Sequence, residues 1–216
     1  QFLVNSIVNK NRRGRIAVRI IACRKYSMAR LEPLAPDASP ELQEQVQRFQ
    51  KLLGYVPSTV LVMCHTPRFV KGVAELASAL WDPASEVDRG LKRLVAYMCG
   101  STHGSKYSMI HAAESAHAAG ISIEKINAVE NYRTSPLFTE AERVTLDFAV
   151  AGASQPNAVT DELFDRMKQH WTETQIVEIT MVVAFNGFLN RWNDTVAPPL
   201  EDKPREFARK HLKRRF

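Results

Sequence analysis

Apolar residues recur every three or four positions along most of the chain, which is the spacing of amphipathic helices. The clearest case is the face shared by Leu91, Leu94, Val95 and Met98. Prolines, glycines and short polar turns separate one such stretch from the next. The expected helices span 40–53, 58–81 with a break or restart at Pro67, 85–99, 105–119, 123–129, 139–153, 160–169 and 172–193.

Helix starts are marked by capping sequences, in which a Ser or Thr stands three residues before a Glu or Gln. Thr139 precedes Glu142 in this way, and Thr172 precedes Gln175. Ser85 with Asp88 resembles a third capping box that has a shorter acid.

No segment convincingly predicts a sheet, although the apolar run 16–23 is too short for its periodicity to separate strand from helix. We predict an all-α fold, a single compact helical domain of about eight helices.

Composition places this domain in a reducing, intracellular compartment. The longest apolar stretch, 176–189, is shorter than the roughly 20 residues that span a bilayer, so we expect it to be a buried core helix. Three cysteines, Cys23, Cys64 and Cys99, lie far apart without a CxxC pair, which does not suggest a disulfide framework.

Charge divides the chain into three parts: a basic N-terminal extension (1–27), a helical domain (28–201) and a basic C-terminal tail (202–216). Residues 1–31 hold eight Lys or Arg and no acid, and 203–216 hold seven with one acid, whereas 32–202 carry a charge of −8. Basic ends on an acidic body predict contact with RNA, anionic lipid or an acidic protein surface. The candidate contact residues are Arg12, Arg13, Arg15, Arg19, Arg24, Lys25, Arg209, Lys210, Lys213, Arg214 and Arg215.

The N-terminal extension has two interpretations. It could dock on a partner, or it could be the remnant of a mitochondrial transit peptide, because such peptides are rich in Arg and poor in acids. On this pattern alone, a mitochondrial location is favoured weakly over a cytoplasmic one.

One stretch carries most of the functional information: CGSTHGSKYSMIHAAESAHAAG, from Cys99 to Gly120. A loop with two glycines leads into a helix that begins near Ser105. Together with SPLFTEAERVTLDFAV and the region from Val159 to Val196, it resembles the peroxidase-related branch of the alkylhydroperoxidase D / carboxymuconolactone decarboxylase family. The resemblance covers roughly 28–201 and implies dimers or higher oligomers, so homodimerisation through the helical domain is expected.

Active members of that family have a glutamate on one helix, a CxxC pair at the start of the next, and a histidine four residues after the second cysteine. A thiol at a helix N-terminus is stabilised as a thiolate, and a second thiol can resolve a sulfenic acid. The resemblance equates these four positions with Arg93, Ser105, Ser108 and Ala112. We therefore expect no catalytic residue of the family type, and no cofactor or metal.

Other residues could provide a replacement chemistry. His111 lies one position before Ala112, about 100° around the helix, and is expected to point elsewhere. Ser108 with His111 could form a Ser–His pair. His111, Glu114 and His117 could offer metal ligands, with His103 as a fourth.

These observations favour a catalytically inactive family member that acts as a structural subunit of a large intracellular protein or ribonucleoprotein assembly, anchored by its basic terminal arms. Two alternatives remain open. One is a peroxidase- or decarboxylase-like enzyme with altered chemistry that uses His111, His103 or Ser105. The other is a free-standing RNA-binding protein, whose affinity would fall steeply with salt.

Overall fold

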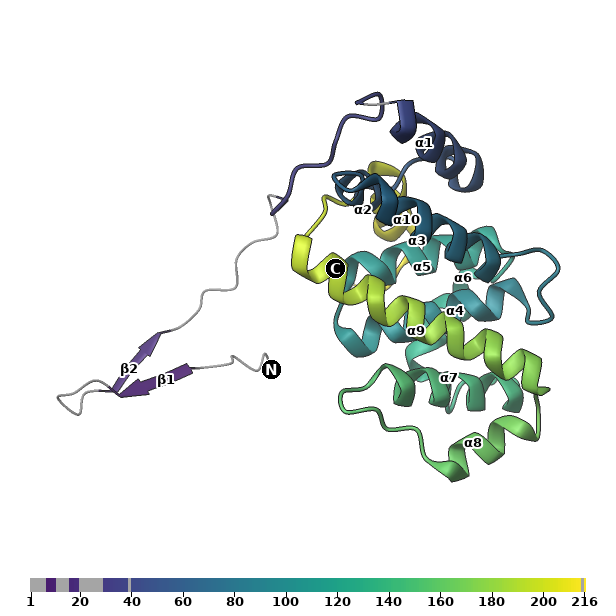
Figure 1. The fold of residues 1–216 in the computed structure, drawn as a ribbon. Helices are drawn as coiled ribbons and strands as arrows, with labels where there is room; N and C mark the ends of the chain where they lie inside the picture. The colour runs from purple at the N-terminus through teal and green to yellow at the C-terminus, as the bar shows by residue number, and fades with distance from the viewer. Residues whose placement is uncertain (1–6, 11–15, 20–28, 39, 215) are drawn as a thin grey trace.

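The computed structural model of the chain describes residues 7–10, 16–19, 29–38, 40–214 and 216. From residue 29 onward the described residues form a body of α-helices, which confirms the expected fold class (Figure 1). The helices are α1 (Pro40–Leu53), α2 (Ser58–Met63), α3 (Pro67–Leu80), α4 (Arg89–His103), α5 (Lys106–Ala118), α6 (Ile123–Ala128), α7 (Glu140–Ala153), α8 (Asp161–Lys168), α9 (Glu173–Val196) and α10 (Asp202–His211), with a 3₁₀ turn η1 (Val129–Asn131) after α6.

Two short strands lie within the N-terminal extension. β1 (Ile7–Lys10) pairs antiparallel with β2 (Ile16–Arg19), and Val8 stands opposite Val18. The expectation that no segment forms a sheet is therefore wrong for these eight residues. The run that begins at Ile16 was too short to decide by periodicity, and the structure makes its first half a strand.

The core lies where α4, α5, α7 and α9 meet. α7 and α8 form one end of the helical body and α1 forms the other, with the long α9 running across it (Figure 1). The core positions are almost fully buried and apolar, and each large side chain contributes roughly 1.5–3 kcal/mol by leaving water. They include Leu94, Val95, Cys99, Met109, Ala113, Leu146, Ala149, Ile179 and Val182.

The corner between α4 and α5 is tight because of two glycines. Gly104 ends α4 with a φ of 76°, a left-handed conformation that glycine adopts without steric cost. At Gly100 a Cβ atom would lie 3.1 Å from Met109 Cγ and 3.2 Å from the Met109 backbone nitrogen. Glycine there allows α5 to pack closely on the end of α4, which fixes the position of Ser105.

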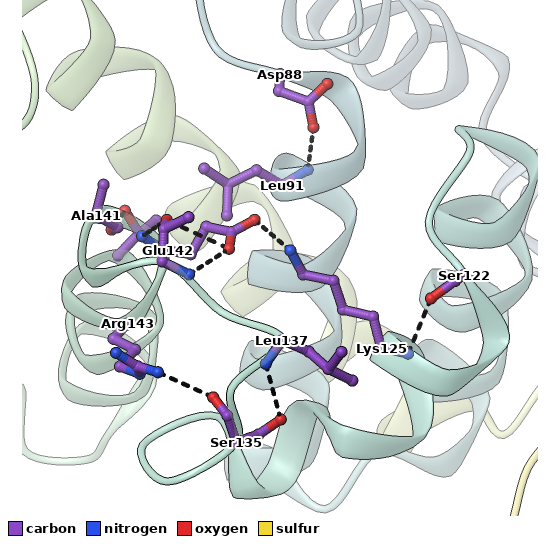
Figure 2. Close-up of polar contacts among 11 residues, drawn as sticks. Asp88, Leu91, Ser122, Lys125, Ser135, Leu137, Ala141, Glu142 and Arg143 are labelled. Atoms are coloured by element: carbon purple, nitrogen blue, oxygen red, sulfur yellow. Dashed lines mark hydrogen bonds and ion pairs between the residues drawn. The ribbon is translucent and has the colours of Figure 1, made fainter.

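Polar contacts fix the ends of several helices (Figure 2). The Asp88 carboxylate accepts a hydrogen bond from the Leu91 backbone N–H at 2.8 Å and caps α4, and the Ser122 hydroxyl accepts one from Lys125 N–H at 3.1 Å and caps α6. The Lys125 ammonium donates to Glu142 at 2.6 Å, so α6 is tied to the start of α7.

Two of the three expected capping boxes are confirmed. Thr139 with Glu142 and Thr172 with Gln175 form reciprocal boxes at the starts of α7 and α9. The box that pairs Ser85 with Asp88 is wrong, because Asp88 is itself the cap of α4. Pro67 separates two helices, and α9 continues to Val196, three residues beyond the expected end.

The C-terminal tail forms part of the helical body. α10 packs on α5, and Phe207, Leu212 and Phe216 contact the main core. Asn127 secures the end of this segment: its amide donates to the His211 carbonyl at 2.9 Å and accepts from the Lys213 N–H at 2.7 Å. Among the described residues, no helix is long and apolar enough to cross a membrane.

Candidate functional site

A cavity of about 140 Å³ lies between the α1–α3 side of the body and helices α4, α5 and α9. Its wall is mostly apolar and aromatic, with a few polar groups. The lining residues are Phe49, Leu53, Tyr55, Pro57, Thr59, Val60, Met63, Val73, Ala77, Trp81, Arg93, Ala96, Tyr107, Ser108, His111, Ala112, Ser115, Phe185, Asn186, Leu189 and Asn193.

The structure brings together the four positions that the resemblance equates with catalytic residues. Arg93, Ser108 and Ala112 line the cavity, and Ser105 is fully buried directly behind Ser108. The Ser105 hydroxyl donates to the Ser108 hydroxyl at 3.2 Å. These four positions therefore lie together, at the start of α5 and on the facing side of α4.

A chain of hydrogen bonds connects Ser108 to α9 and α2. The Asn193 amide donates to the Ser108 hydroxyl at 3.2 Å, and the Thr59 hydroxyl donates to the Asn193 amide oxygen at 2.7 Å. Trp192 Nε1 donates to the same Thr59 hydroxyl at 3.0 Å. Ser108 is thus held as a hydrogen-bonded structural group.

His111 lies in the cavity wall, so the expectation that it points elsewhere is wrong. The angle of about 100° between residues 111 and 112 is correct, but the cavity covers a wide face of α5. Residues 108, 111, 112 and 115 follow the spacing of one helix face and all line it.

Both ring nitrogens of His111 have partners. The Tyr55 hydroxyl lies 2.9 Å from Nδ1, and a Glu201 carboxylate oxygen lies 2.8 Å from Nε2. The Tyr107 ring is tilted against the imidazole with ring centres 4.3 Å apart. His111 is therefore held by residues from α5, the segment before α2, and the start of α10.

Glu201 is the centre of this polar cluster. The Tyr107 hydroxyl donates to it at 2.7 Å, and the Ser58 backbone N–H also donates to it. Burial opposes ionisation, but the hydrogen bonds from His111, Ser58 and Tyr107 outweigh it and lower the pKa of Glu201. Burial raises the pKa values of Tyr55 and Tyr107, and the nearby carboxylates raise them further, so both hydroxyls keep their protons.

The two replacement chemistries proposed from the sequence are not assembled here. Ser108 bonds with Ser105 and Asn193, while His111 bonds with Tyr55 and Glu201, so the two do not form a Ser–His pair. Of the HxxExxH residues, Glu114 pairs with Lys203 at 3.2 Å, and His117 packs against Phe207.

His103 ends α4 and is not among the residues that line the cavity. Burial and the nearby Arg191 lower its pKa.

Two neighbouring cations on α4, the buried Lys92 and the partly buried Arg93, differ in their partners. Lys92 lies 3.0 Å from the Glu178 carboxylate and donates to the Leu80 carbonyl at 3.0 Å. Arg93 stacks on Trp81, with its guanidinium carbon 3.4 Å from the ring centre. Burial lowers the pKa of Arg93 to about 9, which leaves it a cation at neutral pH. Among the described residues, Arg93 forms no ion pair or hydrogen bond, and its Nε atom is buried without a partner.

The described cysteines are not placed for thiol chemistry. Cys64 and Cys99 are both buried, and neither lines the cavity. Burial raises the pKa of Cys64 to about 11 and that of Cys99 to about 12, so both are thiols at neutral pH. Cys23 lies outside the described residues.

The candidate residues of the basic arms are only partly described. Arg209, Lys210, Lys213 and Arg214 are exposed on and after α10, and Arg214 also pairs with Glu130. Arg19 belongs to β2. The remaining candidates, Arg12, Arg13, Arg15, Arg24, Lys25 and Arg215, lie outside the described residues.

Sequence reasoning missed Tyr55, Trp81, Tyr107 and Glu201. Tyr107 stands between the two serines of the motif, and this position is the one signal that could have identified it. Glu201 comes 90 residues after His111 and was assigned to a domain boundary, so no local pattern connects the two.

The fold and the cavity define the class of the protein. It is an all-α protein with a small, mostly apolar cavity beside the N-terminus of α5.

No protein-family model matches the chain. Solved structures do match it. One is the debrominase Bmp8 in a Cys-to-Ala form bound to 2,3,4-tribromopyrrole, at 28% identity and a TM-score of 0.77, covering 83% of this chain and 96% of that one. Another is the alkylhydroperoxidase AhpD core of an uncharacterised peroxidase-related protein from Ralstonia eutropha JMP134, at 19% identity and a TM-score of 0.73, covering 82% and 94%.

The chain has the helical fold of these proteins, which include the alkylhydroperoxidase AhpD core. A curated relative, the uncharacterised protein YnjA of Escherichia coli (strain K12), is 31% identical over 80 residues. That match spans 37% of this chain and 44% of the relative.

Proposed function

We propose that this chain is a catalytically inactive alkylhydroperoxidase D-like protein that serves as a structural subunit of a large intracellular assembly. The observation that carries the proposal is the composition of the site. Ser105 and Ser108 stand where the family resemblance places two cysteines, and Arg93 stands where it places a carboxylate. A serine hydroxyl neither ionises like a thiol nor forms a disulfide, so peroxide reduction through a thiol cannot occur at these positions.

The surface supports a role in binding other macromolecules. Arg209, Lys210 and Lys213 are exposed on one basic segment, and the N-terminal extension adds further cations. Val177, Met181 and Phe188 are exposed apolar residues on α9 that another protein subunit could cover. The acid-free N-terminus favours a mitochondrial assembly.

Size fractionation of native lysate tests this proposal, with mass spectrometry of the proteins that travel with the chain. We expect co-migration with a large complex. A triple variant, Arg209→Gln, Lys210→Gln and Lys213→Gln, should weaken that association. The matched control neutralises Arg68, Lys71 and Lys168, which are exposed elsewhere, and should leave it unchanged.

Charge neutralisation is a sharper test than deletion of the tail. Deletion would also remove Phe207, Leu212 and Phe216 from the core, so a loss of association could reflect unfolding. A lone small oligomer in the native lysate would contradict the proposal.

A second candidate is an enzyme with altered chemistry in the same cavity. Its support is the His111–Glu201 pair beside two tyrosines, together with the 28% identity to a debrominase. The test is bromide release from 2,3,4-tribromopyrrole in the presence of dithiothreitol. Release by the wild type that is lost in His111→Gln would support the enzyme, and equal release by both proteins would exclude His111 as its catalytic group.

A further inference from the structure

The ionisable groups around the cavity differ in whether another side chain lies within ion-pair distance. His111 is paired with Glu201, and Glu114 is paired with Lys203. Arg93 has the Trp81 ring as its neighbour and, within the described part of the chain, no carboxylate within ion-pair distance. Among the described residues that line the cavity, Arg93 is therefore a cation that forms no ion pair.

Such an arrangement is unfavourable unless something else supplies the anion. A buried charge is costly without a partner, and buried polar atoms are almost always hydrogen-bonded in folded proteins. Lys92, the preceding residue, has such partners, since it is buried against a carboxylate and a carbonyl oxygen. Arg93 has no such partner within the described part of the chain, and it lines the cavity instead.

The position of Trp81 leaves the guanidinium free to bind an anion. Stacking covers one face of the planar group, whereas its N–H donors point outward in the plane. Those donors match the two oxygens of a carboxylate. The Trp81 ring thus orients Arg93 without using its hydrogen-bonding edge.

The rest of the cavity wall favours a small ligand with an apolar body. A volume of about 140 Å³ is close to that of a cavity that holds a benzene-sized molecule. Aromatic and aliphatic side chains form most of its wall, among them Phe49, Val60, Met63, Phe185 and Leu189. A ligand that is charged throughout would lose its hydration against this wall, whereas a ligand with one charged end would not.

We propose that this cavity binds a small organic monocarboxylate, with its carboxylate on Arg93 and an aromatic or branched apolar body against the remaining wall. Binding of this kind does not depend on whether the chain is a subunit of an assembly. It would make the protein a carrier or sensor of that carboxylate, with Arg93 and Trp81 as the recognition pair.

Isothermal titration calorimetry of the full chain with benzoate tests the proposal, and benzamide serves as a neutral molecule of the same shape. We expect benzoate to bind at least about tenfold more tightly than benzamide, because a carboxylate forms charge-assisted hydrogen bonds with Arg93. The comparison needs no variant, so it holds even if substitutions at Arg93 impair folding. Equal affinity for the two molecules, or no benzoate binding at millimolar concentrations, would overturn the proposal.

A pair of variants then locates the site. Arg93→Gln should weaken benzoate binding by about tenfold or more and leave benzamide unchanged. Arg68→Gln removes an exposed arginine on α3 and should change neither. Benzoate binding that survives Arg93→Gln unchanged would place the anion elsewhere and would refute the role of Arg93.

Discussion

Lys92 and Arg93 are adjacent cations on α4, the first buried and the second partly buried, and their surroundings differ completely. Lys92 faces the start of α9, where Glu178 also accepts hydrogen bonds from Ser85 and from the backbone N–H groups of Glu86 and Val87. Arg93 faces the cavity and contacts one aromatic ring. The first charge stabilises the fold, because every partner comes from the protein. The second lacks a protein partner, which is typical of a group kept for binding.

Removal of Glu178 should give the largest effect, because it leaves Lys92 buried without its counter-charge. Glu178→Ala is expected to lower the free energy of unfolding by about 3–5 kcal/mol. Glu173→Ala, an exposed position on the same helix, is the matched control and should change it by less than about 0.5 kcal/mol. Urea denaturation measures both. Similar values for the two variants would show that the Lys92 cluster does not stabilise the fold.

The same cluster should make stability depend on pH in the acid range. Burial opposes ionisation of Glu178, but bonds from Ser85, Lys92 and two backbone N–H groups lower its pKa from 4.5 to about 2. Its stabilising contribution is therefore complete above pH 4.5 and is lost as the pH falls towards 2. The expected loss is about 1–2 kcal/mol, because Glu178 is partly exposed and solvent screens its contacts. Thermal unfolding of the wild type and of Glu178→Gln across this range measures it, and parallel curves would contradict the assignment.

Glu201 provides an intermediate case, because its charge has protein partners and one of them, His111, lines the cavity. Glu201→Gln is expected to lower the free energy of unfolding by about 1–3 kcal/mol, because it removes the charge that His111, Tyr107 and Ser58 share. Hydrogen exchange should accelerate in α10, which begins next to Glu201. Faster exchange throughout the body would indicate global destabilisation instead.

Arg93 should give the smallest effect on stability. Arg93→Met is expected to change the free energy of unfolding by no more than about 1 kcal/mol, since it removes a partly buried charge that forms no ion pair within the described part of the chain. Lys92→Met is the adjacent control and should cost about 3–5 kcal/mol, because it leaves the Glu178 carboxylate without its cation. Equal losses for the two variants would mean that Arg93, like Lys92, serves the fold.

The sequence predicted the helical body well where local signals were strong. The capping boxes at Thr139 and Thr172 mark helix starts that the structure confirms, and Gly104 ends α4. The expectation that Gly100 lies in a loop is wrong, because α4 continues to His103. The proximity of Arg93, Ser105, Ser108 and Ala112 could also be predicted, because three of them lie within one motif and the fourth on the preceding helix.

The features of the site that the sequence did not predict depend on contacts between segments that are distant in the sequence. The pairing of His111 with Glu201 joins positions 90 residues apart, and the stacking of Arg93 on Trp81 depends on how α3 packs against α4. The difference between Lys92 and Arg93 has the same origin. The residue types are similar, and only the helix rotation decides that one faces Glu178 and the other faces the cavity.

The most direct test of the central claim, that this family fold has lost its thiol chemistry, is steady-state reduction of hydroperoxide by the purified chain with a dithiol reductant. We predict no turnover above the rate without protein, because Ser105 and Ser108 cannot form a thiolate and because Cys64 and Cys99 are buried thiols. Turnover that depends on the protein and disappears after cysteine alkylation would contradict the claim.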